Sequence, residues 1–173
     1  MNKREKTRSI ILLSSWRLFA EQGYQETTTR QIAELAGVAT GTVFSHFPTK
    51  LDILKTAMLE HISDVIAQAA QTDTQHSPRL KLRHYASYLY RFYLENREFS
   101  KELLGGLIWQ QSFFSAQLES FKQRLFAEQQ YEQTKADVMM DLYFMTLLQG
   151  LNDDAINAEQ LVRILSQKLQ QLG

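Results

Sequence analysis

Two short segments with helical periodicity, residues 28–36 and 40–47, are separated only by Gly37-Val38-Ala39. Glycine tolerates the left-handed conformation that ends many helices, so Gly37 marks the end of the first segment. Pro48 ends the second segment, because proline lacks the amide that a helix interior needs. Two short helices joined by a tight turn are typical of the helix-turn-helix unit, whose second helix enters the major groove of DNA.

The second segment has the faces that a DNA-reading helix needs. Val43 and Phe47 are at positions i and i+4 and are predicted to pack inward. Its outward positions are small residues that let the backbone approach the edges of the bases; they are Thr40, Gly41, Thr42 and Ser45. The sequence therefore predicts site-specific binding of double-stranded DNA through this helix.

Charged and hydroxyl side chains flank the two helices. Arg30 and Lys50 are predicted to hold phosphates, and Thr28 and Thr29 offer hydroxyls and amides at a helix N-terminus. Thr28 and Gln31 also have the spacing of a capping box. Lys50 opposes the dipole of the helix that it begins, so its presence is better explained by an external phosphate than by helix stability.

The rest of the chain predicts an all-α fold of about nine helices, because Gly and Pro lie mostly between segments of helical periodicity. Thr49 is predicted to cap a long fourth helix, with Asp52 in its first turn. The polar stretch 72–77 and Ser77-Pro78 mark a domain boundary. We expect a DNA-binding head of residues 1–50, extending through the fourth helix to about residue 71, and a helical regulatory and dimerisation domain of residues 72–173.

The second domain is predicted to contain five helices with glycine or asparagine at the breaks between them. The expected breaks are Gly105-Gly106, Gly150 and Asn157. The expected ranges are 78–96, 98–104, 107–127, 131–152 and 158–172.

The composition excludes several classes of protein. The 173 residues include no Cys, so neither a disulfide framework nor a thiolate metal site exists. No run approaches the roughly 18 apolar residues of a membrane span, and no Gly-rich phosphate loop or Gly-x-Ser-x-Gly motif occurs. The His residues lack the spacing of a metal site; they are His46, His61, His76 and His84. We expect a cytoplasmic protein that is not an enzyme, has no cofactor or metal, and does not contact a membrane.

The charge is unevenly distributed along the chain. The formal net charge is zero, which argues against a protein that coats nucleic acid nonspecifically. Residues 1–50 contain seven Lys and Arg against four Asp and Glu, whereas the remainder contains 12 against 15. A basic head on an acidic body suits a protein that approaches phosphates with one end.

The first 60 or so residues contain a series of short motifs in a fixed order. They are Thr7-Arg8, Ile11-Leu12, Leu18-Phe19-Ala20-Glu21-Gln22-Gly23-Tyr24, Thr27-Thr28, Ile32-Ala33, Ala36-Gly37-Val38, Gly41-Thr42-Val43-Phe44, His46-Phe47 and Lys50. In these motifs the chain closely resembles the TetR family of bacterial regulators, and the resemblance is specific because many positions match in order.

The resemblance implies a homodimer that binds a near-palindromic operator, acts as a repressor and is released by a small-molecule inducer. It also implies that the last two helices of each chain form a four-helix dimer interface. Residues at the usual DNA-contacting positions of the family are Arg30, Thr40, Gly41, Thr42, Phe44, Ser45, His46 and Lys50.

Two positions depart from the family pattern. Ala39 stands where Ser is common, so the recognition helix lacks a capping hydroxyl unless Thr40 or a phosphate substitutes for it. Phe44 stands where Tyr is usual, so a phenolic phosphate contact is missing. We expect Phe44 either to pack within the protein or to contact a thymine methyl group.

Aromatic residues are abundant in the second domain. Ordinary core packing explains most of them, but with the polar tips of Tyr and Trp they would also suit a cavity for a small apolar or aromatic ligand. The predicted ligand-binding residues are Tyr88, Phe92, Trp109, Phe113 and Tyr143.

The last two helices carry apolar residues at steps of three and four, the pattern of a helix that pairs with a partner. The predicted dimer interface consists of Val138, Leu142, Met145, Leu161, Leu165 and Leu169. The alternative is that these faces pack only within one chain. An alternative for the whole protein is a ligand-independent architectural or adaptor protein that binds DNA.

Overall fold

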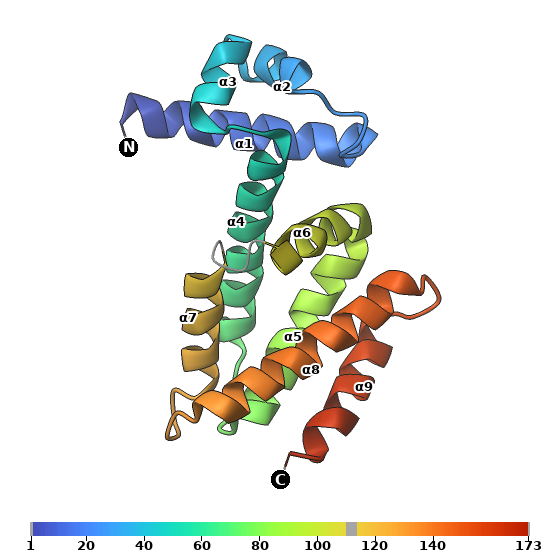
Figure 1. Ribbon diagram of the computed structural model, residues 1–173. Helices are drawn as coiled ribbons and strands as arrows, with labels where there is room; N and C mark the ends of the chain where they lie inside the picture. Colours follow the sequence, from blue (N-terminus) through green and yellow to red (C-terminus); the bar gives the residue numbers. More distant parts are fainter. Residues whose placement is uncertain (1, 110–113, 173) are drawn as a thin grey trace. The chain divides into compact units, whose positions relative to one another are not determined.

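The computed structural model describes residues 2–109 and 114–172, and the regular structure in these ranges is helical throughout (Figure 1). This confirms the all-α prediction. None of the described helices is long and apolar enough to cross a membrane. The helices are α1 (Lys3–Gln22), α2 (Thr29–Ala36), α3 (Thr40–His46), α4 (Lys50–Gln71), α5 (Pro78–Glu95), α6 (Arg97–Trp109), α7 (Ser115–Leu125), α8 (Gln133–Asn152) and α9 (Ala158–Gln170).

The chain divides into two compact units, Met1–His61 and Ile62–Gly173. The division falls inside α4 because the first half of this helix contributes its apolar face to the core of the first unit. That core contains side chains from all four of the first helices, and they are buried by packing on one another. They include Ile11, Leu12, Phe19, Ile32, Val43, Ile53, Leu54 and Met58.

Local capping fixes the ends of the short helices in the first unit. Thr28 accepts a hydrogen bond from the backbone N–H of Gln31, whose side chain accepts one from the Thr28 N–H in return, as the sequence predicted. Gly37 ends α2 with a φ of 66°, a left-handed conformation that favours glycine. Thr49 and Asp52 form the predicted cap of α4, with the Asp52 N–H donating to the Thr49 hydroxyl at 3.1 Å.

The second unit is built around α5, which packs against both α8 and α9 (Figure 1). The rings of Tyr90 and Tyr143 stack with centroids 5.1 Å apart, and the Tyr90 hydroxyl donates to the Tyr143 carbonyl. Helices α8 and α9 approach closely at Gly150, where a Cβ atom would overlap the side chain of Leu161. Glycine is therefore needed at this position for its small volume, although it lies within α8 and not at the predicted break.

The boundaries of α6 and α7 differ from those predicted. Helix α6 continues through Gly105-Gly106 to Trp109, and α7 begins at Ser115, so the predicted helices 98–104 and 107–127 are wrong. A glycine inside a helix costs only about 1 kcal/mol, which the packing of an apolar face can outweigh. Leu103 and Leu104, directly before the glycines, are buried and supply that packing.

Two buried lysines carry ion pairs in the second unit. Lys122 of α7 is 7% exposed and its ammonium lies 2.8 Å from a carboxylate oxygen of Asp137 and 2.7 Å from one of Glu119. Burial lowers the Lys122 pKa, but these hydrogen bonds outweigh it and the pKa is raised overall. The same bonds lower the pKa of the two carboxyls. Helices α7 and α8 are thereby linked by charge as well as by apolar contacts.

Candidate nucleic-acid interface

Helix α3 is anchored in the first unit by two buried side chains, Val43 within the helix and Phe47 directly after it. Val43 is 0% exposed and Phe47 is 2% exposed, which confirms that both pack inward. The guanidinium of Arg8 lies over the Phe47 ring, 4.7 Å from its centre, and forms an ion pair with Glu60 of α4 at 3.8 Å. Cation–π contacts of this kind add to packing. Arg8 thus braces the end of α3 from α1.

The opposite face of α3 is open to solvent. Gly41, Phe44 and Ser45 are exposed, whereas Thr40, Thr42 and His46 are half-buried. Phe44 is 47% exposed, so core packing does not explain this apolar ring. The Ser45 hydroxyl donates to the Thr42 carbonyl at 2.8 Å, which leaves its oxygen able to accept a further hydrogen bond. The predicted outward positions of α3 thus include exposed residues, Gly41 and Ser45, and half-buried ones, Thr40 and Thr42.

The N-terminus of α3 lacks a side-chain cap. Ala39 has no oxygen to offer, and no side-chain hydrogen bond caps this end. The orphan amides of the first turn of a helix carry partial positive charge and readily bind anions. The start of α3 is thus suited to bind a backbone phosphate.

Two of the residues at α2 predicted to contact phosphate, Arg30 and Thr28, already have partners within the chain. Arg30 pairs with Glu34 at 3.1 Å in an exposed i,i+4 bridge, which is a weak interaction that a phosphate can displace. The Thr28 hydroxyl is used in the cap of α2, whereas Thr29 begins the helix and is half-buried. Of these residues, Arg30 has the longest reach and the weakest internal partner.

Lys50 has an internal role that the sequence analysis missed. Its ammonium donates to the backbone carbonyls of Tyr24, Gln25 and Thr27, at 2.7, 3.2 and 2.8 Å, and it lies over the Tyr24 ring. Lys50 thus has an internal explanation besides an external phosphate, because three carbonyls accept hydrogen bonds from its three donors. The predicted phosphate contact of Lys50 stays a prediction.

Three of the five predicted ligand-binding residues lie in the described part of the second unit; Phe113 and the side chain of Trp109 lie outside it. Tyr88 and Phe92 are half-buried on α5, and Tyr143 is 3% exposed on α8. The hydroxyl oxygens of Tyr88 and Thr72 are hydrogen-bonded to each other, 2.8 Å apart.

The hydroxyl of Tyr143 is buried and has no hydrogen-bond partner within the described residues. Burial, followed by the nearby Tyr93 and Tyr90, raises the pKa of Tyr143 well above its ordinary value. Tyr93 is close enough to perturb this hydroxyl but is not in hydrogen-bonding geometry with it. Tyr90 and Tyr93, which are also buried beside Tyr143, were not among the predicted residues, because a row of aromatic residues on one helix does not reveal which of them face inward.

The predicted dimer residues fall into two groups. Leu161, Leu165 and Leu169 of α9 are 0%, 0% and 2% exposed, since they pack within the single chain. These three side chains are therefore covered within the chain and provide no exposed surface for a second chain. A dimer interface that includes other residues of α9 stays a prediction. Val138 and Leu142 of α8 are half-buried, and Met145 is 58% exposed. These three share a side of α8 that the core does not use.

Comparisons with known proteins agree with this geometry. Residues 11–57 match the family model of the bacterial regulatory proteins of the TetR family. The chain is 27% identical over 81 residues to the transcriptional activator FasR of Mycolicibacterium smegmatis, a match that covers 45% of this chain and 37% of FasR. It is 41% identical over 51 residues to the transcriptional repressor BepR of Brucella suis, covering 30% of this chain and 24% of BepR. The matches thus span between 24% and 37% of the length of these relatives.

A solved structure extends the likeness in fold to nearly the whole chain. The TetR family repressor FadR of Thermus thermophilus, in complex with lauroyl-CoA, superposes with a TM-score of 0.68 at 21% identity. The superposition covers 95% of this chain and 92% of FadR. Residues 11–57 therefore carry the conserved unit of the TetR family of bacterial regulatory proteins, and the chain as a whole has the fold of a solved TetR family repressor.

Proposed function

We propose that this protein is a site-specific DNA-binding transcriptional regulator that acts as a homodimer and responds to a small molecule. The observation that carries the proposal is the division of α3 into a buried side, with Val43 and Phe47, and an exposed side, with Gly41, Phe44 and Ser45. A helix anchored in this way presents its exposed side to the major groove, where small residues permit close approach to the bases.

Two sets of residues are proposed to contact the DNA, one the phosphates and the other the bases. Arg30, the free amides at the start of α3 and the hydroxyls of α2 contact the phosphates, which sets the register of the protein on the duplex. Thr42, Phe44 and Ser45 contact the bases. Because Phe44 is exposed and apolar, its partner in the groove is the methyl group of thymine, the apolar feature of the major-groove edges.

The dimer is proposed to form through the exposed side of α8. Val138, Leu142 and Met145 provide an apolar stripe there, and a two-fold axis would place the same stripe of a second chain against it. A dimer would position two α3 helices for the half-sites of a near-palindromic operator. Exposed apolar area on the side of a helix that points away from the core is typical of such an interface.

The ligand site is proposed to lie beside Tyr143. An orphaned buried hydroxyl is costly unless a ligand or an ordered water binds it, and the surrounding rings of Tyr90 and Tyr93 suit an aromatic or apolar molecule. The solved structure of FadR in complex with lauroyl-CoA supports ligand binding by a protein of this fold. The end of α4 is fastened to α5 at His84, whose Nε2 lies 2.8 Å from the Ala69 carbonyl. A shift of α5 on ligand binding would therefore be passed to α4.

The alternative is a ligand-independent architectural protein. Such proteins cover DNA without base contacts and depend on a strong positive charge. The zero net charge of this chain and the exposed reading face of α3 favour specific binding instead.

The test is fluorescence anisotropy with labelled DNA fragments selected for binding from the source genome, compared with scrambled DNA over a salt series. We expect saturable binding of the selected fragment by two chains per duplex. Phe44→Ala should weaken this binding about tenfold, because it removes apolar contact area. Leu13→Ala is the matched control, since Leu13 is an apolar residue with 72% exposure on α1 and should leave affinity within about twofold.

Equal binding of selected and scrambled DNA would favour the architectural alternative. The ligand part is tested by linkage, because an inducer that lowers DNA affinity must itself bind the DNA complex more weakly by the same factor. Ligand affinity that is unchanged by DNA would rule out the proposed release mechanism.

A further inference from the structure

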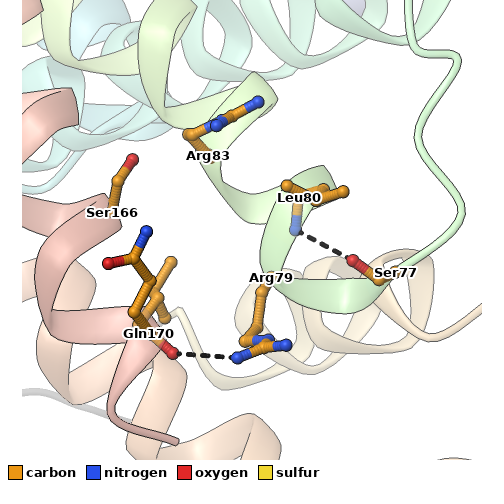
Figure 2. A pocket seen from close by; sticks show the side chains of 7 residues that line it. Ser77, Arg79, Leu80, Arg83, Ser166 and Gln170 are labelled. Atoms are coloured by element: carbon orange, nitrogen blue, oxygen red, sulfur yellow. Dashed lines mark hydrogen bonds between the residues drawn. The ribbon is translucent and has the colours of Figure 1, made fainter. Parts of the chain in front are cut away.

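A cavity of about 200 Å³ lies between the start of α5 and the end of α9 (Figure 2). Figure 2 shows residues of both helices around it. The Arg79 guanidinium spans the gap and donates to the backbone carbonyl of Leu169 at 3.4 Å. The polar lining consists of Ser77, Arg79, Arg83, Ser166 and Gln170. The cavity is thus rich in hydrogen-bond donors.

The two arginines concentrate positive charge at this cavity. Arg79 and Arg83 are one turn apart on α5, and like charges at this spacing destabilise a helix. Both lie near the N-terminus of α5, and the first turn contains no acidic residue to offset them. Within the described residues neither guanidinium has a carboxylate partner. An anion in the cavity would relieve both unfavourable effects.

A neighbouring lysine differs from the two arginines, because it is paired with carboxylates of the same chain. Lys81, between the two arginines in sequence, is 7% exposed and pairs with Asp73 at 3.1 Å and with Glu128 at 3.0 Å. These pairs raise the Lys81 pKa despite its burial. The charge of Lys81 is therefore balanced within the chain. In the part of the chain that the structure describes, the charges of Arg79 and Arg83 lack such carboxylates, so an anion from solution could balance them.

We propose that this cavity binds a small organic anion through a carboxylate or phosphate group. The planar guanidinium of arginine matches the oxygen pairs of both groups, while Ser166 and Gln170 supply further hydrogen bonds from α9. Leu80 and Leu169 form an apolar wall for a short carbon body. Pockets for drug-sized ligands start at about 300 Å³, so the occupant has few atoms besides its anionic group. The inference does not depend on DNA binding.

The test is isothermal titration of the full chain with inorganic phosphate and, separately, with succinate, at constant ionic strength. Succinamide is the uncharged control. We expect saturable binding of at least one anion and none of succinamide. Arg83→Gln should weaken binding about tenfold or more, because a hydrogen bond between charged groups is lost. Arg91→Gln removes the same charge from an exposed position further along α5, outside the cavity, and should change affinity less than about twofold.

A second variant separates geometry from charge. Arg83→Lys keeps the charge but loses the planar fork, and should also weaken binding. Circular dichroism checks that each variant is folded. Binding of phosphate alone or of succinate alone identifies the anionic group and supports the proposal. Failure of both anions to bind, or equal weakening by Arg83→Gln and Arg91→Gln, would overturn it, and neither result bears on DNA binding.

Discussion

The ammonium nitrogen of Lys50 lies 2.8 Å from the carbonyl oxygen of Thr27 and 4.3 Å from the centre of the Tyr24 ring. This contact fastens the loop between α1 and α2 to the start of α4. The residue thereby sets the position of α2, and through it α3, whatever DNA is present. A lysine in the DNA-binding unit can therefore serve binding by holding the fold instead of touching a phosphate.

Lys50→Met should lower the stability of the protein by about 2 kcal/mol, because three carbonyls lose a charged donor. The measurement is the melting temperature by calorimetry, without DNA. Lys6→Met is the control, since Lys6 is exposed on α1 and its removal should have little effect. If Lys50→Met left the melting temperature unchanged and weakened only DNA binding, the loop contact would be unimportant and the phosphate interpretation would return.

Removing thymine methyl groups from the operator should weaken binding in a way that depends on Phe44. A deoxyuridine in place of the contacted thymine lacks only the methyl group, so the affinity of the unmodified protein should fall several-fold. Phe44→Ala should bind both DNAs alike, because the ring that senses the methyl group is gone. Anisotropy on the four combinations measures the coupling. Additive effects of the two changes would mean that Phe44 contacts something else.

Restoring a capping hydroxyl to α3 should stabilise the first unit. Ala39→Ser supplies an oxygen to the orphan amides, which is worth about 1 kcal/mol. Ala39→Val adds bulk without the oxygen and serves as the control. Calorimetric melting of both variants gives the comparison. We expect a higher melting temperature for the Ser variant alone, and a gain in the Val variant of equal size would show that capping is not the cause.

The sequence predicted the local features of this fold well and its long-range packing less well. The Thr28 and Gln31 capping box and the turn at Gly37 depend on neighbouring residues, so their pattern is legible in the sequence. The predicted helix break at Gly105-Gly106 was wrong, because tertiary packing outweighs the small energetic cost of glycine inside a helix.

The two limits of the site prediction have one cause. A periodic apolar face, such as that of Leu161 and Leu165, shows that something covers it, but not whether the cover belongs to the same chain. Likewise, the position of Lys50 beside the helix-turn-helix indicated a charge near the DNA, but not the three carbonyls that the fold brings to it. Contacts between distant segments decide both cases.

Met145→Asp should convert the dimer to a monomer, because a two-fold axis would place two unpaired carboxylates close together in an apolar interface. Light scattering coupled to size-exclusion chromatography measures the mass. Leu13→Asp changes an exposed apolar residue of α1 instead and should leave the dimer intact. A dimeric Met145→Asp variant would exclude this side of α8.

Leu165→Ala, by contrast, should lower the free energy of unfolding by about 2 to 5 kcal/mol, since Leu165 is fully buried within the chain.

The ion pairs of Lys122 predict loss of stability in acid. Hydrogen bonds from Lys122 lower the pKa of Glu119 and of Asp137 in the folded state, whereas in the unfolded chain both groups titrate near about pH 4. A carboxyl whose pKa is lowered by folding stabilises the protein above its unfolded pKa, and this contribution disappears as the pH falls through the folded pKa. The melting temperature should thus be level near neutral pH and fall below about pH 4.5.

Lys122→Met tests whether this lysine causes the effect. The substitution keeps the long apolar stem in a site that is 7% exposed, but it removes the charge that lowers both carboxyl pKa values. We expect a lower melting temperature at neutral pH and a smaller decrease on acidification, measured by circular dichroism between about pH 7 and pH 3.5. A residual decrease should remain, because Asp73 and Glu128 also have lowered pKa values. Lys101→Met, at an exposed position of α6, is the control. If both variants lost the same stability on acidification as the unmodified protein, the acid sensitivity would have to come from other carboxyls.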